Sequence, residues 1–183
     1  MNRTKQFWIG LVCCVGLLLS SCAGGVGGLQ AYNAPDSSYR FLYPNGWVAV
    51  DVRGASPGVD VVFRDIIEQS ENLSVIISQV PEDKSLSELG SPTEVGYRFL
   101  KETKNDEGRE TEFISAEALE HDGNTYYLLE YEVDLPNSQT RHNLASVAVS
   151  RGKLYTFNLS TRAGRWSSVG NAFKTAAQSF TIL

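Results

Sequence analysis

The stretch from Arg141 to Thr161 places the strongest constraint on how this chain can fold. Residues on both sides of Arg151-Gly152 follow a two-residue period. Such a period is typical of a β-strand, and Gly in a two-residue connection is typical of a tight hairpin turn. The sequence therefore predicts two paired strands whose apolar residues alternate with small or polar ones. The small residues on one face would allow a helix to pack closely over the strands.

The rest of the chain carries similar strand signals and two helix signals. Asp122-Gly123 predicts a second hairpin, and Ser91-Pro92-Thr93-Glu94 reads as a capping box with Pro at the first helical position. A helical stripe beginning at Trp166 predicts the second helix. The expected strands are residues 39–43, 47–51, 59–64, 72–80, 110–121, 125–134, 144–150, 153–161 and 180–182, and the expected helices begin at residues 92 and 166.

The first 21 residues have the features of a bacterial lipoprotein signal peptide. Arg3 and Lys5 precede an apolar run from Phe7 to Leu19, which is shorter than a membrane span. Leu19-Ser20-Ser21-Cys22 follows, and this order resembles a lipobox. We therefore expect residues 1–21 to be removed and Cys22 to carry lipid, so that the protein is held at a membrane surface outside the cytosol.

The mature chain would have 162 residues, with 14 basic and 21 acidic side chains. Such an acidic protein is not expected to bind nucleic acid or bare anionic lipid through electrostatic attraction, so any basic surface would be a local patch. Cys13 and Cys14 would leave with the signal peptide and Cys22 would be acylated. The sequence therefore excludes disulfides, thiolate metal sites and a cysteine nucleophile from the mature protein.

The segment after Cys22 predicts a linker and then one domain. Residues 22–38 are rich in Gly and small polar residues without a hydrophobic period, which is typical of a flexible tether. We expect a single folded domain over residues 39–183.

Acidic residues crowd between Glu102 and Asp122, and two interpretations are open. They could bind a divalent cation, but no calcium-loop spacing occurs, so a solvated surface is the favoured interpretation. His121 and Asp122 lie at the predicted hairpin turn. With His142, the second of the two histidines, they are the candidate metal ligands.

Several motifs together resemble the PsbP family of photosystem II extrinsic proteins. These are Tyr43-Pro44-Asn45-Gly46-Trp47, Arg141-His142-Asn143, Gly152-Lys153-Leu154-Tyr155-Thr156-Phe157-Asn158 and Arg165-Trp166. The resemblance extends over residues 39–183, and the predicted lipobox points to the cyanobacterial lipoprotein form within the family. It implies an α+β fold with an antiparallel β-sheet flanked by helices, as an α-β-α sandwich of the PsbP/Mog1-like type.

The resemblance also implies a function. It is that of a non-enzymatic, extrinsic lipoprotein on the lumenal side of the thylakoid membrane, which binds photosystem II components and assists assembly or stability of the oxygen-evolving photosystem. Plant members help to retain calcium and chloride, whereas this chain carries a lipobox and a Gly-rich segment in place of their N-terminal extension. The alternative hypothesis is a lipoprotein that carries or retains manganese, calcium or zinc. No cofactor is expected to be required.

Basic residues at strand ends are the candidate partner-binding residues. If these ends lie together, they would form a positive patch able to bind an acidic loop of a membrane protein, because guanidinium groups pair with carboxylates in bidentate geometry. The alternative is that they are ordinary solubilising charges. The candidates are Arg141, His142, Arg151, Lys153, Arg162 and Arg165.

Catalysis has no support in the sequence. The chain contains no nucleophile elbow, no metalloprotease motif and no Gly-rich phosphate loop. We therefore expect a protein that is not an enzyme.

Overall fold

The computed structural model describes residues 28–52, 57–104 and 109–183. The elements in chain order are β1 (Leu29–Asn33), β2 (Tyr39–Pro44), β3 (Trp47–Val50), β4 (Val59–Asp65), β5 (Asn72–Gln79), η2 (Ser87–Leu89), α1 (Pro92–Lys104), β6 (Glu110–His121), β7 (Asn124–Asp134), β8 (Thr140–Ser150), β9 (Lys153–Arg162), η3 (Ala163–Arg165), α2 (Trp166–Ser179) and β10 (Thr181–Ile182). The predicted strands and helices are confirmed. The signal peptide and the lipid attachment at Cys22 lie outside the described residues.

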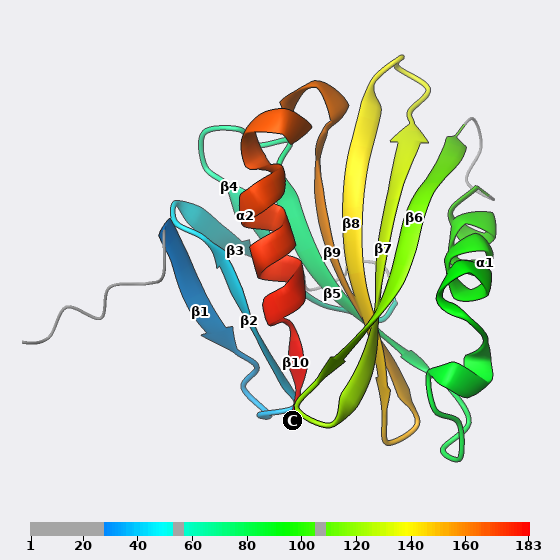
Figure 1. Ribbon diagram of the computed structural model, residues 1–183. Helices are drawn as coiled ribbons and strands as arrows, with labels where there is room; N and C mark the ends of the chain where they lie inside the picture. The colour runs from blue at the N-terminus through cyan, green and yellow to red at the C-terminus, as the bar shows by residue number, and fades with distance from the viewer. Residues whose placement is uncertain (1–27, 53–56, 105–108) are drawn as a thin grey trace, which may run out of the picture.

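Most of the strands form one large antiparallel sheet (Figure 1). Its order is β3-β4-β5-β9-β8-β7-β6, so the hairpin predicted from Arg141 to Thr161 lies near its centre. Arg151 and Gly152 join β8 to β9 with φ of 50° and 71°, and Asp122 and Gly123 join β6 to β7 with φ of 49° and 76°. Positive φ at both central residues gives the turn twist that antiparallel neighbours require. Both predicted hairpins are confirmed.

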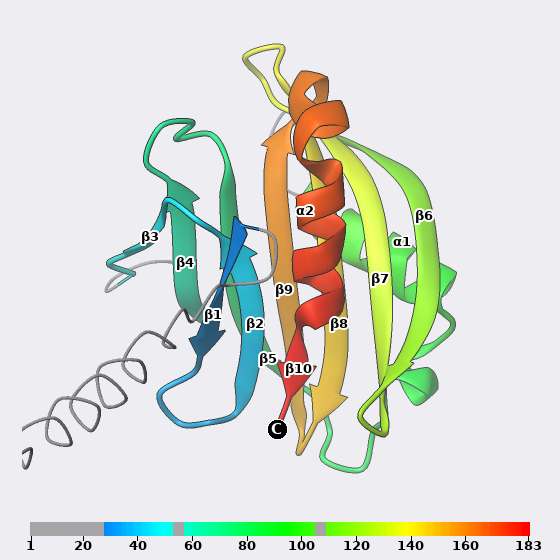
Figure 2. The same cartoon turned by 60° about the vertical axis from the view of Figure 1, so that its left-hand side comes forward.

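One face of the large sheet packs against α2 and a small second sheet. Phe173, Ala176 and Ala177 of α2 are buried against apolar residues of the central strands, among them Phe157 and Leu159. The small sheet, β1-β2-β10, closes the same side (Figure 2). The small side chains of Ala176 and Ala177 let the helix approach the strands closely.

The opposite face of the large sheet is covered by α1. The capping box is confirmed, because the Ser91 backbone N–H donates to Glu94 Oε2 at 2.8 Å and the Glu94 N–H donates to Ser91 Oγ at 3.4 Å. Val95 and Leu100 of α1 are buried against β7 and β8. This helix packs mainly over β6 and β7, and therefore leaves part of the β5, β9 and β8 surface without a helical cover. The predicted α+β fold of a sheet flanked by helices is confirmed.

The predicted boundary between tether and domain was wrong. Residues 29–33, which were assigned to the tether, form strand β1 and pair with β2. Leu29 is buried, and the Tyr32 ring lies 4.9 Å from that of Phe41 and 5.4 Å from that of Phe63. The packing of Leu29 and Tyr32 against the core thus offsets the weak strand propensity of this short segment. The domain includes residues 29–38.

Within the described residues, no helix is long and apolar enough to cross a membrane.

Candidate functional site

The structure divides the predicted basic residues between the two ends of the hairpin. Arg141, Arg162 and Arg165 lie at the end where β8 begins and β9 finishes, and Arg141 faces Arg162 in the strand register. Arg151 and Lys153 lie at the β8–β9 turn, at the opposite end. Eleven residues of β8 span roughly 35 Å at about 3.3 Å per residue. The six residues therefore do not form one patch.

Arg141 is the most informative member of the first group. Its Nε and Nη2 donate to Ser160 Oγ at 3.1 and 2.9 Å, and Nη2 also donates to the Ser70 backbone carbonyl. No carboxylate of the described residues lies within ion-pair distance of this guanidinium. Burial, followed by the neighbouring charge of Arg162, lowers the pKa of Arg141 from its ordinary value. The group is a half-buried cation oriented by neutral acceptors.

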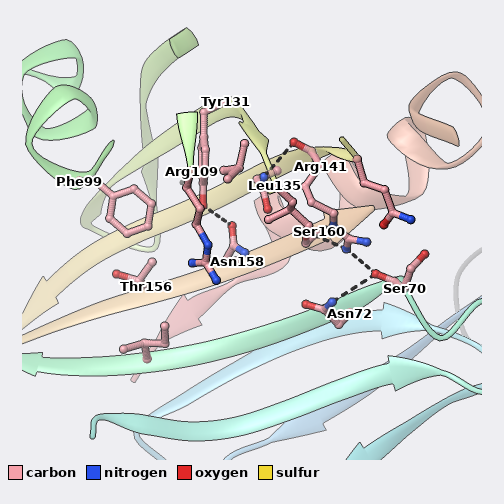
Figure 3. Close-up of a pocket in the computed structure, with 14 residues that line it drawn as sticks. Ser70, Asn72, Phe99, Arg109, Tyr131, Leu135, Arg141, Thr156, Asn158 and Ser160 are labelled. Atoms are coloured by element: carbon pink, nitrogen blue, oxygen red, sulfur yellow. Dashed lines mark hydrogen bonds between the residues drawn. The ribbon is translucent and has the colours of Figure 1, made fainter. Parts of the chain in front are cut away.

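Arg141 lines a groove of about 540 Å³ on the part of the sheet that α1 leaves uncovered (Figure 3). The Tyr131 hydroxyl donates to Asn158 Oδ1 at 3.0 Å, and burial raises the pKa of this tyrosine, so the hydroxyl keeps its proton. No aspartate or glutamate of the described residues lines the groove. Its polar lining is Ser70, Asn72, Arg109, Gln139, Arg141, Asn143, Thr156, Asn158 and Ser160.

This groove has the chemistry of an anion or peptide site. Guanidinium groups pair with carboxylates, and carboxamide side chains offer both donors and acceptors to a peptide backbone. Phe99, Val133 and Leu135 add apolar surface at its edge. A small apolar pocket beneath α1, which shares Phe99 and Thr156 with the groove, continues it toward Val147 and Leu154. The combination can accept an extended acidic segment with an apolar side chain.

His142 faces the other side of the sheet and is buried. Its Nε2 lies 2.8 Å from Glu130 Oε1 and its Nδ1 lies 2.9 Å from Glu132 Oε1. The ring stacks on Trp166 with centroids 3.9 Å apart. Only the protonated imidazolium can donate from both nitrogens, so this arrangement suits a cation between two carboxylates. At 5% exposure His142 has little surface to offer a partner.

Arg162 and Arg165 are paired with carboxylates. Arg165 Nε donates to Glu71 Oε1, and that buried carboxylate also accepts from Thr161 Oγ1 at 3.1 Å. Arg162 Nη2 lies 3.7 Å from Glu68 Oε1. The positive charge at this end is thus partly neutralised, and Arg141 is the member of this group that contacts no carboxylate of the described residues.

The three candidate metal ligands are not brought together. His121 and Asp122 lie at the β6–β7 turn, with His121 Nε2 3.4 Å from Asp122 Oδ2, and Asp122 also contacts Arg40 at 3.6 Å. His142 pairs with Glu132 near the far end of β7. Across the described ranges, no three His, Cys, Asp or Glu side chains form a cluster that could hold a metal ion.

The polar side chains of the groove were not predicted from the sequence as functional residues. Thr156, Asn158 and Ser160 alternate with the apolar Tyr155, Phe157 and Leu159 of β9, and this polar face was interpreted only as room for a helix. Asn72 and Asn143 join them from β5 and β8 because the strands are in register. The available signal was a polar face on a central strand, where a fully covered sheet would have apolar residues.

Comparisons with known proteins were consistent with the motif resemblance. The family model described as PsbP matches residues 27–182. CyanoP of Synechocystis sp. (strain ATCC 27184 / PCC 6803 / Kazusa) is 55% identical over 168 residues, which cover 90% of this chain and 89% of that protein. The solution structure of Synechocystis CyanoP superposes with a TM-score of 0.74 at 55% identity and covers 90% of this chain and 99% of that one. The Ran-binding protein Mog1p of Saccharomyces cerevisiae shares the fold, with a TM-score of 0.55 at 8% identity over 84% of this chain and 95% of its own.

Proposed function

The chain belongs to the PsbP family, and on this premise we propose that it is a non-enzymatic lumenal protein that binds photosystem II components and assists the assembly or stability of that complex. The family match and the motif resemblance support the association with photosynthesis. We further propose that lipid on Cys22 attaches it to the lumenal side of the thylakoid membrane. The lipobox-like Leu19-Ser20-Ser21-Cys22 supports this attachment.

The observation that carries the docking proposal is Arg141 in its groove. No carboxylate of the described residues contacts this half-buried guanidinium, and the more distant Glu71 and Glu68 offset only part of its desolvation, because the pKa of Arg141 is still lowered. An acidic segment of a partner would supply a counter-ion and displace groove water. The surrounding amides would then bind its backbone, so that recognition is by geometry as well as by charge.

If the protein is attached to the membrane by lipid, a weak contact between the groove and its partner would be enough for binding. A domain held to the membrane samples a thin layer above it, so a membrane-protein partner meets it at high effective concentration. A groove that binds a free acidic peptide only weakly can then still hold the partner complex. Weak binding is therefore enough for a tethered docking protein, whereas a carrier must bind its cargo tightly in solution.

Charge reversal at Arg141 tests the proposal. The chain with Arg141→Glu should lose most of its co-purification with photosystem II subunits, because the new carboxylate repels an acidic segment. The matched control is Arg151→Glu, which makes the same charge change at the opposite end of the hairpin and should leave co-purification unchanged. Arg162→Glu, at an exposed position beside Arg141, provides a second variant in case Arg141→Glu impairs folding.

Co-purification and metal affinities of these variants together distinguish docking from the alternative function, which is to carry a metal ion. Thermal unfolding first establishes that each variant is folded, and calcium, manganese and zinc affinities are then measured on the same samples. Loss of co-purification with unchanged metal affinity supports docking. Co-purification that survives reversal at both Arg141 and Arg162 would refute the groove as the docking site.

A further inference from the structure

The loop between β4 and β5 presents two isoleucines to solvent. Ile67 is 90% exposed and Ile66 is 57% exposed, and Ile67 is the most exposed of the large hydrophobic residues described. Isolated exposed apolar residues are common, but two adjacent ones at the tip of a loop form a small apolar surface. The loop lies at the same end of the molecule as the start of α2 (Figure 1).

Hydrogen bonds hold this loop in one conformation. Asp65 Oδ1 accepts from the backbone N–H of Ile67 at 2.6 Å and of Glu68 at 2.9 Å. The Glu71 N–H donates to the Glu68 carbonyl at 2.8 Å, and the Asp65 N–H donates to the Glu71 carbonyl at 3.1 Å. The carboxylate of Asp65 is therefore used to fix the backbone, and the isoleucines are presented outward by a preformed turn.

The chain enters the domain beside this loop. The Asn45 N–H donates to the Gly28 carbonyl at 2.8 Å, and the Ile66 N–H donates to the Gly46 carbonyl at 3.4 Å. Two hydrogen bonds thus connect Gly28 to Ile66 through the β2–β3 turn. Only residues 23–27 separate Gly28 from Cys22, and this distance is at most roughly 20 Å even in an extended chain. A lipid on Cys22 would hold this end of the domain close to the bilayer.

We propose that the β4–β5 loop, with Ile66 and Ile67 at its tip, contacts the lipid bilayer surface beside the anchor. The inference rests on the proposed lipid attachment at Cys22. The short connection brings the loop to the membrane, and isoleucine side chains gain by entering the interface. Arg64 and Arg162, both exposed near the loop, are suited to the phosphate groups of lipids.

Ile66 and Ile67 could contact either the lipid bilayer or a groove on a partner protein. The bilayer is favoured because the chain enters the domain beside this loop. A protein partner requires no anchor at this edge, whereas a tether of at most roughly 20 Å keeps this edge of the domain near the bilayer. The contact would also orient the molecule, with the β8–β9 turn pointing away from the lipid (Figure 1).

Depth-dependent quenching tests the contact. The lipidated full-length product, purified from membranes, is reconstituted into vesicles of phosphatidylcholine and phosphatidylglycerol that contain no other protein. An environment-sensitive nitrobenzoxadiazole label is attached at Ile67→Cys, and the matched control is Asp83→Cys, an exposed position after the far end of β5. Spin-labelled lipids should quench the label at residue 67 about threefold or more strongly than the label at residue 83. Equal quenching at the two positions would overturn the proposal.

A second variant and a mass measurement distinguish the contribution of the loop to membrane contact from that of the lipid anchor. Ile66→Ser with Ile67→Ser removes the apolar tip without changing buried residues, and a label at Gln69→Cys in that background should lose the quenching that it shows with both isoleucines present. Unchanged quenching there would count against the isoleucines. The mass of the N-terminal peptide shows whether Cys22 is acylated. Loop quenching at residue 67 without acylation would remove the proposed anchor and still support the loop contact.

Discussion

At the scale of single residues, His142 was predicted to bind a partner or a metal at the surface, but it is buried and bonded within the protein. It stacks on Trp166 and links Glu130 to Glu132. We expect His142→Phe to keep the stacking but to leave two partly buried carboxylates without their shared hydrogen-bond partner. The free energy of unfolding should fall by about 2 kcal/mol or more.

The control for that substitution is His121→Phe. His121 lies at an exposed turn, so its replacement should change the free energy of unfolding by less than about 0.5 kcal/mol. Urea unfolding of both variants measures the difference. Equal midpoints would mean that the His142 network contributes nothing to stability.

Arg141 and His142 also show what sequence alone could and could not predict. The two-residue period was recognised, and it sends adjacent residues to opposite faces of the sheet. Treating Arg141-His142 as one basic end ignored that rule, although Leu144 on the His142 face indicated a buried side. The partners of each residue could not be predicted, because Glu130 and Ser160 come from neighbouring strands whose register is not known from the sequence, and Ser70 comes from the β4–β5 loop.

At the scale of elements, Gly96 shows how closely α1 approaches β6. A Cβ at this position would lie 2.6 Å from Cε2 of Phe113, a ring that also contacts Tyr97 with centroids 4.7 Å apart. Ala normally stabilises a helix relative to Gly by about 1 kcal/mol. Overpacking costs about 1–3 kcal/mol. We expect Gly96→Ala to lower the free energy of unfolding by about 1 kcal/mol in a chemical denaturation experiment.

Gly164 provides the matched control. A Cβ there meets no atom within 4 Å, so Gly164→Ala should be neutral or slightly stabilising. If Gly96→Ala stabilises the protein as much as Gly164→Ala does, then the Phe113 ring can move away and α1 is not tightly packed on β6 at this position.

Strand β1 shows, also at the scale of elements, that a local residue pattern does not predict every strand. Long elements such as β7 and β8 carry enough alternation to be predicted, and both hairpin turns have the residues that their φ values require. The five residues of β1 follow a Gly-rich segment and have little strand signal of their own. Their strand is stabilised by Phe41 and Phe63, which are contributed by β2 and β4. That tertiary contribution cannot be read from composition.

At the scale of the whole molecule, three proposed features lie at one end. The chain entry at Gly28 is connected to the β4–β5 loop through the β2–β3 turn, and Ser70 of that loop connects it to the groove by accepting from Arg141 through its carbonyl. With this end at the bilayer, the β8–β9 turn would lie roughly 35 Å farther out. The groove would then face partners close to the membrane surface.

The length of the connection between Cys22 and Gly28 should therefore determine how well the protein docks. A Gly/Ser insert of about 24 residues after Gly25 would lengthen this connection about fivefold. Since effective concentration falls with roughly the −3/2 power of length, it should decrease about tenfold. Co-purification with photosystem II subunits at matched expression should decrease correspondingly, while the same insert placed after Leu183 should have no effect. Equal co-purification with both inserts would show that tethering does not concentrate the domain at its partner, and the groove would then have to supply the whole affinity.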